Sequence, residues 1–463
     1  MRLHRILLPA AGLAFLWYES GWTAPLWVLG LALVTWLIGL RLGSAAADGR
    51  KKAAKLWLLL GLAADLGLLL YFKFFKCGGL IAPLGLSYYT LSIAAYLIDV
   101  AHKKHPAEDN FADYLCFVTF FLSLLQGPIN PYRKLMPQIK APLGFRKEAL
   151  GSGLRRILWG LFKKMVIADR LGIAVIAGLK DPAVGGFALF LIMVLYSFQI
   201  YSDFSGGIDV IMGIAEILGF FLPENFRAPF LAETVSDFWK RWHISLGDWM
   251  EKYLYYPLVL SKPMQRLTKK IKSKYFRSVF AASAASFAVF VVVGIWHGTG
   301  WNYVIYGLYQ AFWVSGGILT SPARKKLRGK LHINDKCLPW RIFCILRTFV
   351  ILVFGRYLSR AGSLQQAFSL YSRTFSPNAA GTLAETLGGL GLDRANLLLV
   401  PVLLILLLAA EIAAGRGLKR EEVWARLAFP VRALILLAGI FGILVLGMYG
   451  PGYDAAAFIY QSF

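Results

Sequence analysis

Apolar runs, separated by short polar and basic segments, follow one another along the whole chain. A helix needs about 20 mainly apolar residues to cross the hydrocarbon core of a membrane, and shorter runs can be tilted, re-entrant or enclosed by other helices. The pattern therefore predicts an all-α integral membrane protein with about eleven transmembrane helices, plus re-entrant and interfacial helices. The apolar runs cover residues 6–18, 23–40, 56–72, 81–100, 111–125, 184–200, 208–222, 279–296, 301–318, 342–354, 397–410 and 431–446.

The composition agrees with a membrane location. Hydrophobic residues make up 58% of the 463 residues and charged residues only 16%, which excludes a water-soluble fold. The net charge of +25 would suggest nucleic acid as a partner of a soluble protein. Here the basic residues cluster between apolar runs, at 41–55, 262–277 and 324–336. Such clusters are typical of cytoplasmic loops that contact membrane lipids, so no nucleic-acid partner is expected.

Two segments between the apolar runs have the composition of helices that lie along the membrane surface. Residues 154–176 mix basic and apolar side chains and are expected to lie among the headgroups rather than to span. Residues 234–254 start with a capping-box-like pattern at Thr234 and Asp237, and their aromatic side chains repeat at helical spacing. This second segment therefore predicts a single amphipathic helix at an interface. The basic residues of the first segment are Arg155, Arg156, Lys163, Lys164 and Arg170.

Signals for several common sites are missing from the sequence. The four cysteines are not spaced as metal ligands, and the chain indicates neither a zinc site nor a disulfide framework. No Walker, Rossmann, nucleophile-elbow or zinc-protease spacing occurs either, which disfavours nucleotide hydrolysis. The cysteines are Cys77, Cys116, Cys337 and Cys344.

His297 is the first candidate for chemistry, because an ionisable group beside an apolar span is costly unless it has a role. It follows the run that ends at Trp296, and residues 298–300 separate it from the next run. An imidazole at such a helix break can face a cavity and take a proton from a hydroxyl group near neutral pH, while glycines leave room for a substrate. The alternative is a structural histidine that hydrogen-bonds to a neighbouring helix.

His243 lies in the amphipathic segment 234–254, where Arg241 falls on the charged face. The aromatic stripe beside it indicates packing and anchoring at the headgroups, and His243 can simply hydrogen-bond at its edge. A catalytic role for His243 does not follow from this periodicity.

A third polar cluster, at residues 199–209, directly follows the apolar run 184–200 and contains Asp203, Ser205 and Asp209. Carboxylates and hydroxyls within an apolar region could line a pocket for a carbonyl-bearing or phosphate-bearing donor. They could equally pair with arginine or lysine side chains of neighbouring helices, which is the interpretation we favour.

Four polar and aromatic stretches stand out when they are taken together. They are Tyr-Ser-Asp-Phe-Ser-Gly-Gly at 201–207, Asn-Phe-Arg-Ala-Pro-Phe at 225–230, Phe-Trp-Lys-Arg-Trp-His-Ile-Ser-Leu at 238–246, and Trp-His-Gly at 296–298 before Trp-Asn at 301–302. In order and spacing, they resemble the membrane-bound O-acyltransferase family. Shorter matches lie at 83–89, 127–129, 137–138 and 458–460. The resemblance is dense over 81–313 and is strongest to the bacterial branch of alginate O-acetyltransferases and teichoic acid D-alanyltransferases.

The resemblance implies one membrane domain, residues 1–463, whose helices surround a central tunnel. His297 is then the catalytic histidine that activates an acceptor hydroxyl, and His243 a second catalytic histidine that orients the donor or the oxyanion of the transition state. The family motifs also suggest a set of substrate-binding residues, which comprises Trp296, Asn302, Asp203, Ser205 and Arg241.

The resemblance further implies the reaction partners. We expect no permanently bound cofactor and no metal, but an acyl thioester from the cytoplasm, either acetyl-CoA or an acyl carrier protein. The acceptor is then a hydroxyl of a cell-surface polysaccharide or of a secreted or membrane-anchored partner, at the cell membrane of a bacterium. Three alternatives remain open at this point: D-alanyl transfer to teichoic acid, a proton-coupled transporter that uses His297 and Asp203, and a structural assembly subunit.

Overall fold

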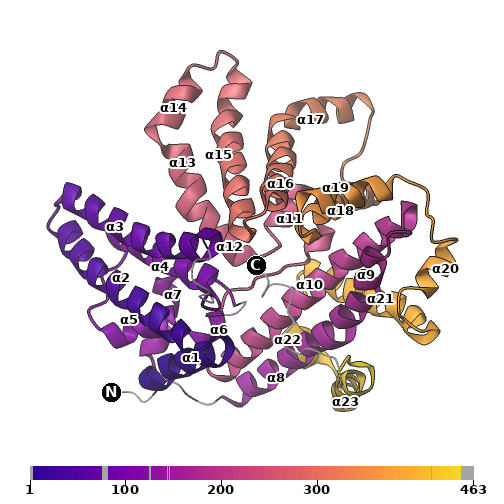
Figure 1. Ribbon diagram of the computed structural model, residues 1–463, viewed down its shortest axis with the longest axis horizontal. Helices are drawn as coiled ribbons and strands as arrows, with labels where there is room; N and C mark the ends of the chain where they lie inside the picture. The colour runs from indigo at the N-terminus through magenta and orange to yellow at the C-terminus, as the bar shows by residue number, and fades with distance from the viewer. Residues whose placement is uncertain are drawn as a thin grey trace. The chain divides into compact units, whose positions relative to one another are not determined.

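The computed structural model describes residues 4–75, 82–124, 127–142, 144, 146–418 and 420–449. In this part of the chain the regular secondary structure is helical, and a single isolated β-bridge joins Phe226 and Trp242 (Figure 1). The predicted all-α class is therefore confirmed. Cys77 and the motif at 458–460 lie outside the described residues.

Seven helices of the described part are long and apolar enough to cross a membrane. The shorter apolar helices Leu86–Ala101 and Phe111–Leu124 add two further hydrophobic segments, so the predicted number of about eleven spans is not confirmed. The seven are α2 (Thr23–Ala47), α3 continued by the π-helical turn η1 (Lys51–Phe75), α10 (Gly186–Ile217), α15 (Lys274–His297), α18 (Leu338–Arg360), α21 (Arg394–Gly415) and α23 (Phe429–Leu446).

Contacts within the chain define two compact units. The first comprises Met1–Ile157 with Ile208–Glu224, and the second comprises Leu158–Gly207 with Asn225–Phe463. Besides α2, α3 and parts of α8 (Lys147–Leu161) and α10, the first unit contains α1 (His4–Ser20), α4 (Leu86–Ala101), α5 (Phe111–Val118), α6 (Phe121–Leu124) and α7 (Tyr132–Lys140).

The second unit contains all the motif stretches between 201 and 302. Helix α10, which carries the first of these stretches, continues from this unit into the first one. The further elements of the second unit are η3 (Phe162–Ala168), α9 (Asp169–Lys180), η4 (Pro229–Leu231), α11 (Val235–Trp239), α12 (Ile244–Met250), η5 (Glu251–Tyr255), α13 (Tyr256–Leu260), α14 (Lys262–Lys269), α16 (Trp301–Leu319), α17 (Ser321–Lys330), α19 (Leu364–Thr374), α20 (Leu383–Gly388) and α22 (Arg420–Arg426).

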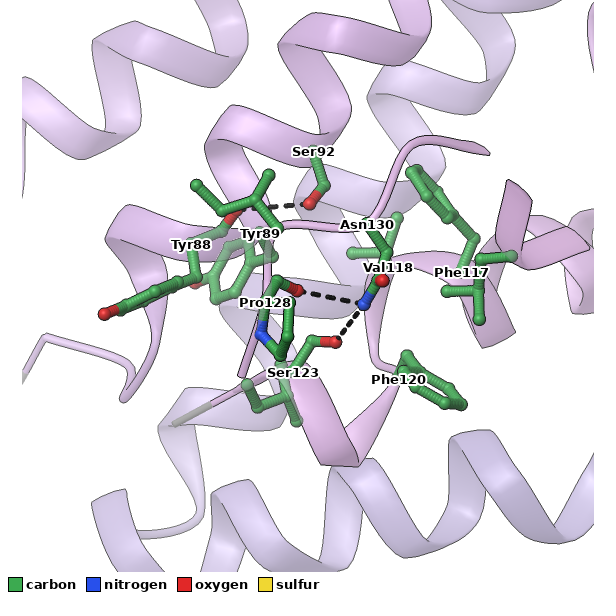
Figure 2. A pocket seen from close by; sticks show the side chains of 12 residues that line it. Tyr88, Tyr89, Ser92, Phe117, Val118, Phe120, Ser123, Pro128 and Asn130 are labelled. Carbon is green, nitrogen blue, oxygen red and sulfur yellow. Dashed lines mark hydrogen bonds between the residues drawn. The ribbon is translucent and has the colours of Figure 1, made fainter. Parts of the chain in front are cut away.

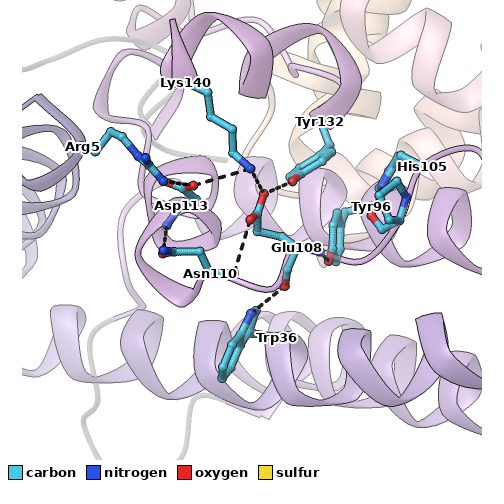
Figure 3. Close-up of polar contacts among 10 residues, drawn as sticks. Arg5, Trp36, Tyr96, His105, Glu108, Asn110, Asp113, Tyr132 and Lys140 are labelled. Carbon is cyan, nitrogen blue, oxygen red and sulfur yellow. Dashed lines mark hydrogen bonds and ion pairs between the residues drawn. The ribbon is translucent and has the colours of Figure 1, made fainter. Parts of the chain in front are cut away.

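A buried ion-pair network holds the first unit together (Figure 3). Asp113 on α5 pairs with Arg5 on α1 and lies 3.5 Å from the ammonium group of Lys140 on α7. The same ammonium group lies 2.6 Å from Glu108, which also accepts a hydrogen bond from Tyr132. Because the two carboxylates are buried, each needs these cationic and hydroxyl partners. The network therefore joins three helices of the unit.

The two N-terminal motif matches meet at a small pocket in the first unit (Figure 2). Tyr88 and Tyr89 from the first match line it together with Pro128 and Ile129 from the second. Asn130 closes one side, because its amide donates hydrogen bonds to the Ser123 hydroxyl at 2.7 Å and to the Pro128 carbonyl at 2.9 Å. These motif residues thus have a clear packing role in their own unit.

Residues 154–176 differ from the sequence prediction. Four of their five basic side chains do not lie among headgroups, because Lys163, Lys164 and Arg170 are buried and Arg156 is 8% exposed, whereas Arg155 is half-buried. Arg156 pairs with Asp209 at 2.8 Å and with Glu224 at 2.6 Å within the first unit. The pattern of basic and apolar residues is the same for a surface helix and for a helix with internal ion pairs, and only the distant carboxylates decide between them.

Helices α15 and α16 form an antiparallel pair that carries His297 at the turn (Figure 1). The pair is close because Gly294 and Gly307 face each other. A Cβ atom on Gly307 would lie 2.5 Å from the carbonyl oxygen of Phe290, and one on Gly294 would lie 2.5 Å from that of Tyr303. Backbone atoms cannot rotate away, so small residues are required where two membrane helices approach this closely.

Gly307→Ala is therefore expected to lower the free energy of unfolding by about 1–3 kcal/mol, the usual cost of overpacking. Thermal unfolding of the purified chain in detergent measures the effect. Gly316→Ala on the same helix is the matched control, because a Cβ atom there meets nothing within 4 Å. Equal unfolding temperatures for the two variants would contradict the close packing of α15 and α16.

Candidate active site

His297 is the last residue of α15, and α16 begins at Trp301. The predicted helix break is therefore confirmed. The His297 side chain is buried, with its ring centroid 5.1 Å from that of Trp296 and 6.2 Å from that of Tyr306 on α16. The space beside Gly298 is not open to a substrate, however, because a Cβ atom there would lie 2.3 Å from the Tyr303 ring. The expectation that this glycine leaves room for a substrate is thus wrong.

His243 lies at a break that the sequence did not predict. The single helix expected at 234–254 is two short helices, α11 and α12, separated by residues 240–243. Thr234 does cap α11 as predicted, since its hydroxyl accepts a hydrogen bond from the Asp237 backbone N–H at 3.0 Å. α11 ends at Trp239, and His243, directly before α12, has a φ of 50° in the left-handed region, so one helix cannot continue through it.

A backbone bridge explains this strained conformation. The Arg227 N–H donates to the Arg241 carbonyl at 2.9 Å, and the Ile244 N–H donates to the Asn225 carbonyl at 3.0 Å. These bonds surround the bridge of Phe226 with Trp242. A non-glycine residue with positive φ persists only where surrounding contacts hold it, and such positions cluster at functional sites.

Hydrogen bonds fix the tautomer of His243, and burial fixes its charge. Its Nδ1 lies 3.3 Å from Oδ1 of Asn225, and the same oxygen accepts hydrogen bonds from the Ser245 backbone N–H at 3.0 Å and the Ser245 hydroxyl at 2.9 Å. Nδ1 therefore carries the proton that it donates. Burial lowers the pKa of His243 to about 3, so the imidazole is neutral at physiological pH and its Nε2 is an acceptor.

An aromatic cluster brings the motif stretches of the second unit together. The Phe204 ring lies 5.0 Å from those of both Phe226 and His243, at nearly right angles to each. The His243 ring in turn lies 6.3 Å from the indole of Trp296, the neighbour of His297. Residues from 201–207, 225–230, 238–246 and 296–298 thus belong to one buried group. Both histidine rings neighbour the indole of Trp296 in this group.

Asp203 and Ser205 lie on α10, which runs without interruption through the polar cluster that separates two predicted apolar runs. Asp203 pairs with Lys164 at 2.7 Å, and the Ser205 hydroxyl accepts a hydrogen bond from Lys163 at 2.8 Å. These contacts are the internal pairs that we favoured from the sequence. They also stabilise the helix across Gly206 and Gly207 by tertiary interactions, against the low helix propensity of glycine.

Asn302 and Arg241, the other predicted substrate-binding residues, also make contacts within the protein. The Asn302 amide donates hydrogen bonds to the carbonyls of Ala361 at 2.8 Å and Leu358 at 3.2 Å, and so satisfies the end of α18. Arg241 is half-buried and pairs with Asp237 at 2.9 Å. Trp296 contacts the rings of both histidines. The substrate-binding roles of all five remain predictions.

Sequence reasoning missed Asn225 and Arg356. Asn225 orients His243, but in the sequence it stands in a polar loop with no periodic signal. Arg356 on α18 is buried, with its guanidinium carbon 4.7 Å from the centroid of the Trp242 ring. An arginine two residues after the apolar run 342–354 was a usable signal, because ionisable groups at such depth are costly.

The fold and the site define a helical multi-pass membrane protein whose second unit holds two buried histidines beside one tryptophan. Residues 22–355 match the membrane-bound O-acyltransferase family. The chain belongs to this family and is an O-acyltransferase.

Named relatives are bacterial. A probable alginate O-acetylase of Pseudomonas aeruginosa is 30% identical over 399 residues, which cover 80% of this chain and 69% of that protein. The peptidoglycan O-acetyltransferase of Helicobacter pylori is 30% identical over 405 residues, 77% of this chain and 72% of the relative. The teichoic acid D-alanyltransferase of Bacillus subtilis is 30% identical over 286 residues, 60% of this chain and 69% of the relative.

Proposed function

We propose that this protein transfers an acetyl group from a cytoplasmic thioester to a hydroxyl of a cell-surface polysaccharide, or of a secreted partner that completes the transfer. The observation that carries the proposal is the pair of buried histidines whose rings both neighbour the indole of Trp296. The relatives named for O-acetylation of alginate and of peptidoglycan support an acetyl group and a glycan acceptor. The family assignment favours this enzyme over the transporter and the assembly subunit.

In this mechanism His297 is the general base. Its imidazole takes the proton of the acceptor hydroxyl while the hydroxyl oxygen attacks the thioester carbonyl carbon. The carbon–sulfur bond then breaks, the thiolate leaves, and the imidazolium returns the proton to the thiolate. A thiolate is a good leaving group, so the protein contributes mainly positioning and one proton transfer, and no resident cofactor or metal is required.

His243 orients the donor in this proposal. A neutral imidazole with its proton on Nδ1 offers a lone pair at Nε2, which can accept a hydrogen bond from an N–H group. The pantetheine arm of a thioester donor carries two amide N–H groups. An oxyanion would need a hydrogen-bond donor at Nε2 instead. Of the two roles expected for His243, its tautomer therefore favours orientation of the thioester substrate.

The proposal includes a location and partners. We place the protein in the bacterial cell membrane, in contact with membrane lipids, with acetyl-CoA or an acyl carrier protein on the cytoplasmic side. A central tunnel would let donor and acceptor reach His297 from opposite sides. A second candidate, D-alanyl transfer to teichoic acid, is favoured by the B. subtilis relative, although it matches less of this chain than the acetylating relatives do.

A donor assay separates the two candidates. Membranes that contain the protein are incubated with radiolabelled acetyl-CoA or with a carrier protein charged with labelled D-alanine, and label in the glycan fraction is counted. We expect transfer from acetyl-CoA, with a signal on the order of 10²-fold or more above the His297→Ala variant. Label from the D-alanyl carrier alone would support the second candidate, and label from neither would reject both.

A further inference from the structure

Arg356 is a buried cation beside the segment that carries His243. Its side chain comes from α18, is 4% exposed, and stacks over the indole of Trp242, the residue that precedes His243. It directly follows the last residue matched to the family, Gly355. None of the roles assigned above uses it.

No anion within the described residues accompanies this guanidinium, and it makes no hydrogen bond there. The other two arginines that are buried to a similar degree do have partners. Arg156 pairs with two carboxylates, and Arg170 donates to the Asn396 side chain and to two backbone carbonyls. A cation–π contact alone returns less free energy than removal of a guanidinium from water costs. Arg356 therefore lacks the partner that its burial calls for.

Two tyrosine hydroxyls near Arg356 are in the same condition. Tyr196 on α10 is 1% exposed and Tyr306 on α16 is 4% exposed, and neither hydroxyl takes part in a hydrogen bond in the described part of the chain. Helix α16 packs against α18, and the Tyr196 ring lies beside the guanidinium of Arg360 on α18. The Tyr306 ring also lies 6.2 Å from the His297 ring, so Tyr306 is next to the proposed base, whereas Arg356 is next to the His243 segment.

We propose that Arg356, Tyr196 and Tyr306 form a subsite for an anionic oxygen group of a substrate, either a phosphate of the thioester donor or a carboxylate of an acidic acceptor. The inference rests on the proposed function, because the anion belongs to one of its substrates. A guanidinium presents planar N–H donors that match a carboxylate or a phosphate, and the hydroxyls add two more donors. Arg360, one turn further along α18, is half-buried with its guanidinium 5.6 Å from the Tyr196 ring, and adds positive charge beside the subsite.

Binding of matched ligands to the purified full-length chain in detergent tests the phosphate source. The probes are acetyl-CoA and S-acetylpantetheine, which has the same thioester arm without phosphates. If the anion is a phosphate of the donor, the wild-type chain binds acetyl-CoA more tightly than S-acetylpantetheine. Arg356→Gln then reduces this ratio of affinities by about 10- to 100-fold, the value of a charge-assisted hydrogen-bond pair. Arg341→Gln on the same helix is the control, since the Arg341 side chain is exposed and already has a carboxylate partner, Glu233, at 2.9 Å.

A second pair of probes tests the carboxylate source. They are an oligomer of alginate and the same oligomer with its carboxyl groups reduced to alcohols. If the anion belongs to the acceptor, Arg356→Gln removes the preference for the acidic oligomer and leaves the donor preference unchanged. Arg356→Lys keeps the positive charge but loses the planar arrangement of N–H donors of the guanidinium. It is therefore expected to retain only part of the preference for acetyl-CoA or for the acidic oligomer, depending on which of the two the wild-type chain shows. It also carries the test if the glutamine variant does not fold.

The subsite is rejected if Arg356→Gln, or the lysine variant in its place, unfolds at the wild-type temperature and changes neither preference by more than about two-fold. In that case Arg356 is a packing residue. Because these measurements need no turnover, they are independent of the catalytic proposal. If the chain discriminates between the probes but transfers no label, the subsite is supported and the proposed function is rejected. If it transfers label but does not discriminate between the probes, the proposed function is supported and the subsite is rejected.

Discussion

His297→Ala is expected to lower the rate of acyl transfer by about 10²- to 10⁴-fold, the usual contribution of a general base. The reason is that the variant has no group in place to take the acceptor proton as the carbon–oxygen bond forms. The initial rate of label transfer from acetyl-CoA, measured with equal amounts of purified protein in lipid vesicles, gives the effect. The variant should bind acetyl-CoA as the wild type does, because the base is not needed for binding.

The control for this prediction is His102→Ala, which removes an exposed histidine at the end of α4. It should transfer at the wild-type rate. His297→Gln adds a second comparison, since it keeps a side chain of similar polarity at the turn between α15 and α16 but cannot act as a base. If either His297 variant kept more than half of the wild-type rate, the catalytic assignment of His297 would be abandoned, and a structural histidine would be the better description.

Asp203→Ala is expected to lower the free energy of unfolding by about 3–5 kcal/mol, because it leaves a buried lysine without its main counter-ion. Burial lowers the pKa of Lys164, but the attraction of Asp203 and of Asp169 outweighs it, and the pKa is raised overall. The lysine is therefore charged at neutral pH, and its pairing contributes stability below its ordinary pKa that is lost as the pH rises through the raised value. Asp169, 2.9 Å from Lys164, replaces only part of the lost interaction.

Thermal unfolding of the purified chain measures this loss, with the double variant Lys164→Met and Asp203→Leu as the comparison. Replacing both partners by apolar residues of similar size is often neutral, so the double variant should unfold much closer to the wild-type temperature than the single variant does. A different outcome would identify Asp203 as a substrate ligand. Asp203→Ala would then unfold at the wild-type temperature and show a raised KM for the donor or the acceptor.

Local signals were sufficient for some parts of the site. The break at His297 follows from the glycines between two apolar runs, and the start of α11 follows from Thr234 and Asp237. Both features depend on neighbouring residues, whose hydrogen bonds and conformational preferences can be deduced directly. The same reasoning failed at His243, where α11 and α12 separate because residues 225–227 pair with residues 241–244. Helical periodicity continues through the break, so nothing local reveals it.

The buried charges likewise depend on partners that are distant in the sequence. Lys163 and Lys164 have surface-like neighbours in sequence, and their partners Ser205 and Asp203 stand about 40 residues away. Arg356 contacts Trp242 from a helix more than 100 residues further along. Local patterns indicate how much charge a segment carries, but they do not show whether an opposite charge lies across from it.

The sequence alone determined the membrane class, the helical fold, the family motifs and the position of His297 at a helix end. Each of these depends on hydropathy or on residues adjacent in the chain, whose energetics are local. Only the tertiary structure decided that burial keeps His243 neutral while Asn225 fixes its tautomer, that Asp203 pairs with Lys164, and that Arg356 is buried with no counter-ion among the described residues. Those facts depend on which distant groups share a low-dielectric interior, where an electrostatic partner decides whether a charge is tolerated.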